Sequence, residues 1–200
     1  MTSESQVKQE YWIALAAVLV VALAAAALVL LWRRRRGPRL SQALQEVSID
    51  RLQNVLVPDG MGGQIQVEHL LLTANGLVVI DVKEFEGTIF AGDRMAEWTV
   101  IGQRGRFTFP NPLGTLYDRV AALKQIVRDV PVVGLVLFGS GADFTKGRPK
   151  DVVLPAELVE RYQKPDQVDR ERLLVAFAPH WERVKAAIEP VTRGARVKLR

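Results

Sequence analysis

The stretch VEHLLLTANGLVVIDVKEF, residues 67–85, contains two apolar runs that are joined by Asn75-Gly76. Asn-Gly between β-rich runs is typical of a two-residue hairpin turn, because both central residues of a type I′ turn need a positive φ angle. The pattern therefore predicts a tight hairpin with strands at 64–73 and 77–84. The charged residues within this apolar hairpin need a separate explanation.

The register of the hairpin predicts where its charged side chains lie. With Asn75-Gly76 as the loop, Glu68 faces Lys83 on the opposite strand. Because side chains alternate across a strand, Glu68, Asp81 and Lys83 then project from one face. Diagonal neighbours lie roughly 7 Å apart at the backbone, so one hard cation can bridge Glu68 and Asp81. A cross-strand ion pair between Glu68 and Lys83 at the rim of a sheet is the simpler alternative.

Composition excludes several kinds of site. Cysteine is absent, which excludes disulfides, thiolate nucleophiles and cysteine-bound metals. The two histidines, His69 and His180, lie too far apart in sequence to suggest a zinc cluster or a Ser-His-Asp set. Alternation along the strand predicts that His69 points away from Glu68 into a packed layer rather than serving as a ligand.

Sequence patterns on both sides of the hairpin indicate an α/β domain. Apolar spacing predicts a helix at 38–47 before a strand at 49–58, and small β structure from Gly87 to Pro110 after the hairpin. Three further elements complete the pattern: a helix beginning at Leu113, a fully buried strand at 132–138 and a mostly helical C-terminal part. The predicted order is thus helix, three strands, helix, strand, with a mixed sheet flanked by helices.

The N-terminal part predicts a single membrane span. Residues 11–32 contain no charged side chain, and 22 helical residues are long enough to cross a hydrocarbon core of about 30 Å. Arg33–Arg36 follow directly, which by the positive-inside rule places the C-terminal side in the cytoplasm. This arginine run also suits contact with anionic lipid. We therefore expect a single-pass protein of the plasma (inner) membrane.

The chain divides into five segments on this interpretation. They are a short extracytoplasmic N-terminus at 1–10, the span at 11–32, a basic juxtamembrane segment at 33–39, a domain at 40–140 and a loop with a helical extension at 141–200. The net charge of +5 belongs mostly to the arginine run, because residues from 40 onward carry 21 basic and 20 acidic side chains. Bulk charge therefore does not predict a partner for the domain.

A family resemblance extends this interpretation. The run QIQVEHLLLTANGLVVIDVKEFEG at 64–87, together with Trp98 and Asn111-Pro112-Leu113, resembles the NERD, or nuclease-related, domain. NERD domains are grouped with the PD-(D/E)XK nucleases. The resemblance covers roughly residues 40–140, and it implies a restriction-endonuclease-like core that cleaves phosphodiester bonds in DNA or RNA.

The resemblance also implies site residues. An acid on the second core strand and an acid-x-Lys on the third hold the metal, Mg²⁺ or Mn²⁺, and the attacking water in that family. Here these positions correspond to Glu68 and to Asp81-Val82-Lys83, with Glu46 of the first helix as an assisting acid. The expected catalytic residues are thus Glu68, Asp81, Lys83 and Glu46, and the expected metal ligands are Glu68, Asp81 and Val82.

Two positions depart from the family pattern. The family usually has Asp where this chain has Glu68, and Gln shortly after Asn-Pro-Leu where this chain has Gly114-Thr115-Leu116. Two functions therefore stay open at this point. One is a membrane-anchored, metal-dependent nuclease, and the other is a catalytically inactive, membrane-tethered module that binds nucleic acid or serves as a scaffold on the same fold.

Overall fold

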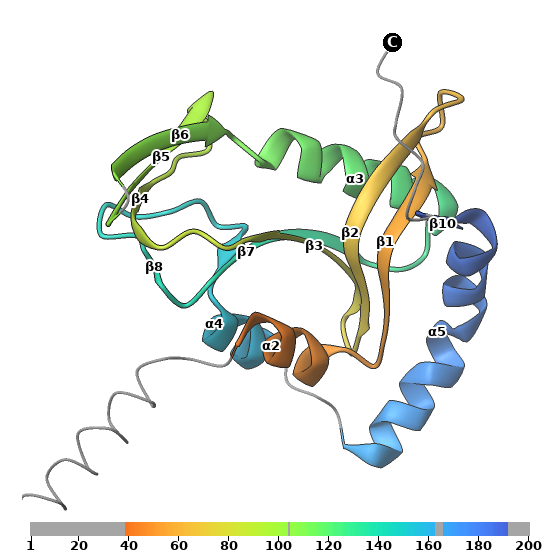
Figure 1. Cartoon of the computed structure of the whole chain (residues 1–200). Coiled ribbons are helices and arrows are strands. Elements are labelled where there is room, and N and C mark those ends of the chain that lie inside the picture. Colours follow the sequence, from red (N-terminus) through yellow and green to blue (C-terminus); the bar gives the residue numbers. More distant parts are fainter. Residues whose placement is uncertain (1–38, 104, 163–165, 192–200) are drawn as a thin grey trace, which may run out of the picture. The chain divides into compact units, whose positions relative to one another are not determined.

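The computed structural model describes residues 39–103, 105–162 and 166–191 (Figure 1). The predicted span at 11–32 and the arginine run at 33–36 lie outside the described residues. In the part of the chain that the structure describes, no helix is both long and apolar enough to cross a lipid bilayer.

The described elements form two sheets and four helices. In chain order they are α2 (Leu40–Val47), β1 (Asp50–Pro58), β2 (Gln64–Thr73), β3 (Gly76–Lys83), β4 (Gly87–Phe90), β5 (Glu97–Gly102), β6 (Gly105–Pro110), α3 (Leu113–Ile126), β7 (Val132–Phe138), β8 (Ala142–Asp143), β9 (Val152–Val153), α4 (Pro155–Arg161), α5 (Gln167–Ala187) and β10 (Glu189–Pro190).

The larger sheet has the strand order β10-β1-β2-β3-β7-β9. Its β10, β1, β2 and β3 pair antiparallel, whereas β3, β7 and β9 pair parallel. The smaller sheet has the order β6-β5-β4-β8. The mixed α/β architecture with sheets flanked by helices agrees with the prediction and is compatible with a nuclease-like core, in which α2, β1–β3, α3 and β7 supply the expected order.

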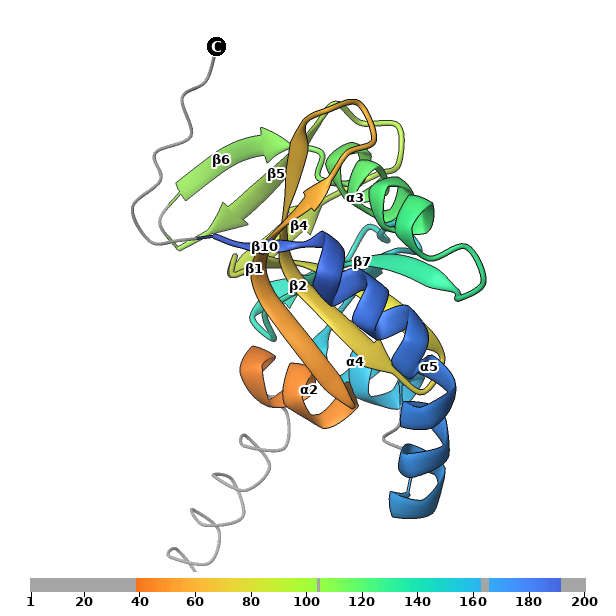
Figure 2. The same ribbon diagram turned by 90° about the vertical axis from the view of Figure 1, so that its right-hand side faces the viewer.

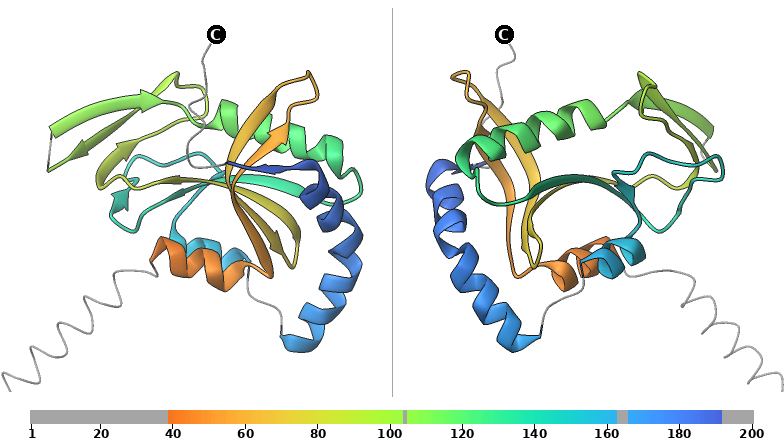
Figure 3. Two further views of the ribbon diagram at one scale, coloured as in Figure 1. Left: turned by 45° about the vertical axis from the view of Figure 1, so that its right-hand side comes forward. Right: turned by 180° about the vertical axis from the view of Figure 1, so that it is seen from behind.

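Helices cover both faces of the larger sheet. Figure 3 shows α3 on one face and α2 with α4 on the other. Two apolar cores follow from this arrangement. The α3 side holds Leu70, Leu77 and Val79, and the α2 side holds Leu71 and Ile80.

Strand β3 lies at the centre of these layers. Its apolar run from Leu77 to Ile80 is buried on both faces, as expected for a strand that pairs with a parallel neighbour under helices. Full burial of one such side chain contributes about 1.5–3 kcal/mol relative to its exposed state. The core therefore holds β3 firmly, and with it the residues that follow Ile80.

Helix α3 approaches the sheet closely at Gly134 of β7. A Cβ atom at this position would lie only 2.8 Å from Leu116 Cγ and 2.8 Å from Val120 Cγ2. Leu116 is fully buried, and together with Leu123 it belongs to the apolar stripe of α3. The close contact fixes the helix, and thus its polar residues, above β3.

The C-terminal helix α5 is tied to the start of β1. Trp181 Nε1 donates to Asp50 Oδ2 at 2.7 Å, and Arg170 Nη2 donates to the carbonyl of Ile49 at 3.0 Å. Figure 2 shows α5 running beside β1, with β10 returning to pair with that strand. The C-terminal extension is therefore packed on the core that precedes it and does not extend from it as a separate arm.

The hairpin register differs from the prediction. Thr73 pairs with Gly76, so Ala74-Asn75 form the two-residue turn rather than Asn75-Gly76. The Thr73 hydroxyl explains the shift, because it donates to the carbonyl of Gly76 at 2.9 Å and accepts from the Asn75 amide at 3.2 Å. The prediction that Glu68 faces Lys83 was therefore wrong.

Candidate functional site: an acid-lysine pair beside a split in the sheet

The candidate site lies where β2 separates from β3. The paired residues of these strands run from Thr73–Gly76 to His69–Ile80 and end there. On its other side, β3 stays paired with β7 as far as Lys83. The last residues of β3, including Asp81 and Lys83, are thus held by β7 and are free of a strand neighbour on the β2 side.

A bend in the β1–β2 ribbon explains the separation. Asn54 has a φ angle of 50°, the only positive value at a non-glycine residue in the described chain, and the ladder lacks a pair between Gln53–His69 and Val55–Val67. Side-chain alternation also changes there, because Val67 and Leu70 both face the α3 core. The uninterrupted alternation expected along β2 was therefore wrong, and Glu68 lies at the break.

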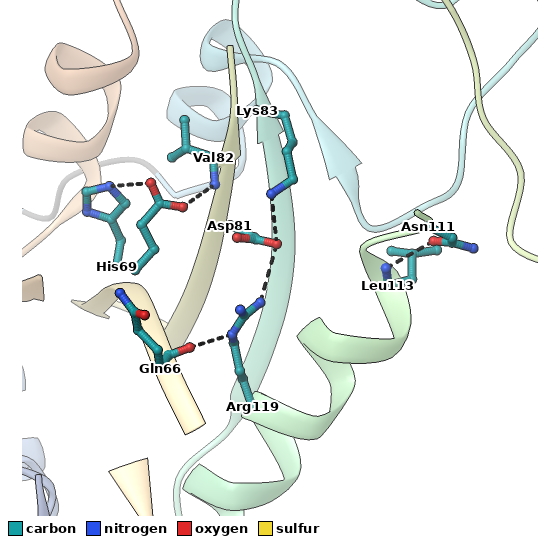
Figure 4. A network of polar contacts seen from close by, with 9 residues as sticks. Gln66, His69, Asp81, Val82, Lys83, Asn111, Leu113 and Arg119 are labelled. Carbon is teal, nitrogen blue, oxygen red and sulfur yellow. Dashed lines mark hydrogen bonds and ion pairs between the residues drawn. The ribbon is translucent and has the colours of Figure 1, made fainter. Parts of the chain in front are cut away.

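Asp81 is the centre of the polar contacts in the site. It is 7% exposed, and its Oδ2 lies 3.3 Å from Lys83 Nζ and 3.3 Å from Arg119 Nη1 (Figure 4). Asp81 and Lys83 are two residues apart on β3, so they project from the same face. The structure therefore brings this predicted pair together, and it adds an arginine from α3.

Arg119 joins the two strands across their split. Its Nε donates to the carbonyl of Gln66 on β2 at 2.6 Å, while its Nη1 reaches Asp81 on β3. The sequence analysis missed this residue. Its signal is helical spacing, because Thr115 and Arg119 are four residues apart and share a face of α3 beside the apolar stripe.

Glu68 takes a different position from the one predicted. Its Oε2 accepts from the main-chain amide of Val82 at 3.0 Å, and its Oε1 lies 3.9 Å from His69 Nε2. The carboxylate thus replaces the ladder bond that β2 would otherwise give to Val82. Glu68 is held at the peptide between Asp81 and Val82 and forms no ion pair with Lys83.

His69 is half-buried beside Glu68. Burial lowers the pKa of His69 below its ordinary value of 6.5, and nearby Arg51 acts in the same direction, although Glu68 partly opposes them. Its Nδ1 is buried without a hydrogen-bond partner among the described residues. We expected His69 to pack in one layer with Val67 and Leu71. These two residues belong to the apolar cores on opposite faces of the sheet, so that layer does not exist.

A cleft of about 360 Å³ opens beside the Asp81-Lys83 pair. This volume lies within the range of about 300–1,000 Å³ that is usual for ligand pockets. Its walls combine charged, polar, aromatic and proline residues: Asp81, Lys83, Phe85, Phe109, Pro110, Asn111, Pro112, Thr115 and Arg119.

Asn111 places the N-terminus of α3 at this cleft. Its Oδ1 accepts from the Leu113 amide at 3.0 Å (Figure 4). Its Nδ2 donates to the carbonyl of Met95 at 2.8 Å. Asn111 thereby connects the first turn of the helix with the loop before β5. The positive end of the α3 dipole faces the same space as Lys83, which favours an anion there.

Three of the predicted residues, Glu46, Glu68 and Val82, are not among the residues that line the cleft. Glu46 is exposed on α2, which packs on the opposite face of the sheet from α3. The side chain of Val82 packs against the α2 core. The sequence analysis also missed three residues that line the cleft, namely Phe85, Phe109 and Thr115. The only sequence feature that indicates them is that they lie close to Asp81-Val82-Lys83 or to Asn111-Pro112-Leu113.

The acids of the site can be compared with the needs of a metal ion. In the described part of the chain, no three His, Asp or Glu side chains form a metal-binding group. Mg²⁺, however, often uses only one or two carboxylates with retained waters and substrate phosphates. Oδ1 of Asp81 has no protein partner among the described residues, and Glu68 lies at the next peptide. This donor set suits a hydrated hard cation rather than a fully enclosed metal.

Comparison with known proteins agrees with this picture. The chain is 26% identical over 112 residues to an uncharacterized protein of Bacillus anthracis, a match that covers 54% of this chain and 53% of that protein. The chain thus spans about half the length of this curated relative. No solved structure matches the chain. The family described as "Nuclease-related domain" matches residues 38–139, half of the 200 residues. The chain therefore belongs to the nuclease-related domain family.

Proposed function

We propose that this protein is a metal-dependent phosphodiester hydrolase that acts on nucleic acid. The observation that carries the proposal is the convergence of Asp81, Lys83 and Arg119 in a cleft of a nuclease-related domain. We further propose that residues 11–32 anchor it in the plasma (inner) membrane, with the catalytic domain in the cytoplasm.

The charges of the cleft suit a phosphodiester. Lys83 and Arg119 carry two positive charges against the single carboxylate of Asp81, so the group attracts an anion. A lysine beside the attacking water favours the deprotonated form of that water. The same ammonium group offsets the negative charge that grows on the phosphoryl oxygens. Asp81, in turn, holds Lys83 in the cleft.

Asp81 would hold the metal through Oδ1, with Glu68 as the second carboxylate. A bound Mg²⁺ or Mn²⁺ supplies a Lewis acid that polarises the phosphate and lowers the pKa of bound water. We assign Arg119 a positioning role. It donates to Gln66 on β2 and to Asp81 on β3, and it thereby fixes the distance between the two strands where they separate.

A specific observation also favours the second candidate, a nucleic-acid-binding module without catalysis. Oδ2 of Asp81 already has two cationic partners, and Glu68 already accepts from the Val82 amide. These contacts stabilise each other without a metal. An inactive domain would keep the anion-binding cleft and lose only the chemistry.

A cleavage assay on the full chain in mild detergent tests the proposal. Supercoiled, linear and single-stranded DNA and RNA are incubated with Mg²⁺, Mn²⁺ or EDTA. We expect cleavage only with a metal, loss of cleavage in Asp81→Asn and a roughly 10²- to 10³-fold slower rate in Lys83→Ala. Asp143→Asn and Lys185→Ala are matched controls, because both residues are exposed on other elements.

Metal binding separates the two candidate functions further. In titrations followed by Mn²⁺ electron paramagnetic resonance, Asp81→Asn should lose the bound ion, whereas Lys83→Ala should keep or increase its affinity because a positive charge is removed. If the folded wild-type protein binds nucleic acid but neither binds Mn²⁺ nor cleaves, the binding module is the correct function.

A further inference from the structure

An aromatic wall extends from the candidate site to the surface. Phe85 lies two residues after Lys83, the last residue of β3, and its ring centroid lies 4.8 Å from that of Phe109 and 5.2 Å from that of Phe107. Phe85 and Phe109 line the cleft beside Lys83. Phe107, two residues before Phe109 on β6, continues the same face of the strand outward.

This wall is anchored on one side and open on the other. Trp98 and Val100 of β5 are fully buried and pair with Phe109 and Phe107. Phe107 itself is 44% exposed. Strand β6 is also an edge strand, with β5 as its neighbour. The hairpin thus holds the rings rigidly while it leaves aromatic surface in contact with water.

A phenyl surface beside two cations is a specific combination. Proteins that bind single-stranded nucleic acid pair a positive groove for the backbone with aromatic rings on which bases stack. An apolar peptide would leave the net positive charge of Lys83 and Arg119 with Asp81 unbalanced. A free phosphate would leave the aromatic surface uncovered.

We propose that the site takes single-stranded nucleic acid, with an unpaired base against the wall of Phe85, Phe107 and Phe109 and its phosphate at Lys83 and Arg119. This inference rests on the proposed function for the reaction, but the binding step stands apart from it. A base inside a duplex has both faces covered by its neighbours and cannot stack on a side chain without being extruded. Extrusion of a paired base costs unpairing and unstacking free energy, so an unpaired strand is the preferred ligand.

Fluorescence anisotropy on the full chain in mild detergent, with EDTA present, tests binding without cleavage. The probes are a labelled single-stranded DNA, the RNA of the same sequence and the corresponding DNA duplex. We expect both single strands to bind more tightly than the duplex. Phe107→Leu keeps an apolar side chain but removes the ring, and it should weaken single-strand binding roughly 5- to 100-fold.

Ile101→Ala is the matched control variant. Ile101 is 46% exposed on the same hairpin, but it pairs with Arg106 and therefore lies on the opposite face from Phe107. The Ile101→Ala variant should bind the single strands with the affinity of the wild-type protein. Phe107→Trp gives a second measurement that keeps an aromatic ring, and it should preserve or tighten binding.

The outcomes are distinct for the two proposals. Single-strand preference that is lost in Phe107→Leu and kept in Ile101→Ala supports the inference, even if the protein cleaves nothing and the hydrolase proposal fails. Equal or tighter binding of the duplex overturns the inference, as does unchanged affinity in folded Phe107→Leu. If the inference about single strands is overturned in this way but the protein still cleaves duplexes in the presence of a metal, the hydrolase proposal stays intact.

Discussion

At the residue scale, the carboxylate of Glu68 holds the open edge of β3 through its main chain. Glu68 accepts a hydrogen bond from the Val82 amide, and this bond takes the place of the ladder bond that β2 does not supply there. Removal of its carboxylate would leave that amide without its acceptor, at a cost of about 1–3 kcal/mol. Glu68 thus has a structural role in this conformation in addition to its proposed role as a metal ligand.

His69 should make the protein less stable in mild acid. Its pKa in the folded state lies below 6.5, chiefly because burial disfavours the imidazolium, so the unfolded chain binds the proton more readily. This contribution to stability is complete above pH 6.5 and is lost as the pH falls through 6.5 toward the folded pKa. Urea unfolding at pH 8 and pH 5 measures the loss, which should shrink in His69→Gln.

A nuclear magnetic resonance titration checks the same prediction directly. The imidazole signal of His69, assigned by comparison with His180→Gln, should titrate below pH 6.5 in the folded protein. A midpoint at or above 6.5 would show that the Glu68 carboxylate outweighs burial.

At the scale of elements, the start of β3 directly after the hairpin turn depends on a glycine. Gly76 has a φ angle of 112°, and a Cβ atom there would lie 2.5 Å from the carbonyl oxygen of Pro131. Gly76→Ala should therefore lower the free energy of unfolding by about 1–3 kcal/mol, as measured by urea denaturation. Gly114→Ala is the control, because it is helical with nothing within 4 Å, and it should be neutral or stabilising by up to about 1 kcal/mol. Equal effects of the two substitutions would contradict this explanation of the turn.

At the scale of the whole molecule, the orientation proposed for the membrane anchor can be measured. The chain contains no cysteine, so one introduced thiol gives one signal. A membrane-impermeant maleimide on intact spheroplasts should label Ser3→Cys and should not label Ser140→Cys, which is exposed after β7. Both variants should react after detergent lysis. Labelling of Ser140→Cys in intact spheroplasts would place the domain outside the cytoplasm and make an intracellular nucleic-acid substrate untenable.

The sequence by itself determined the elements and the acid-lysine pair. The apolar run of β3, the stripe of α3 and the run of β7 are local patterns, and each one predicts its element from neighbours along the chain. Asp81 and Lys83 lie on one face because alternation along a single strand needs no distant contact.

Only the tertiary structure decided what surrounds that pair. Arg119 comes from a helix 38 residues further along the chain than Asp81, and the close approach at Gly134 brings that helix over the sheet. Glu68 leaves its expected place where the β1–β2 ladder is interrupted opposite Asn54, whose φ angle is positive. Contacts between distant segments depend on packing geometry, and a pattern of neighbours along one chain does not contain that geometry.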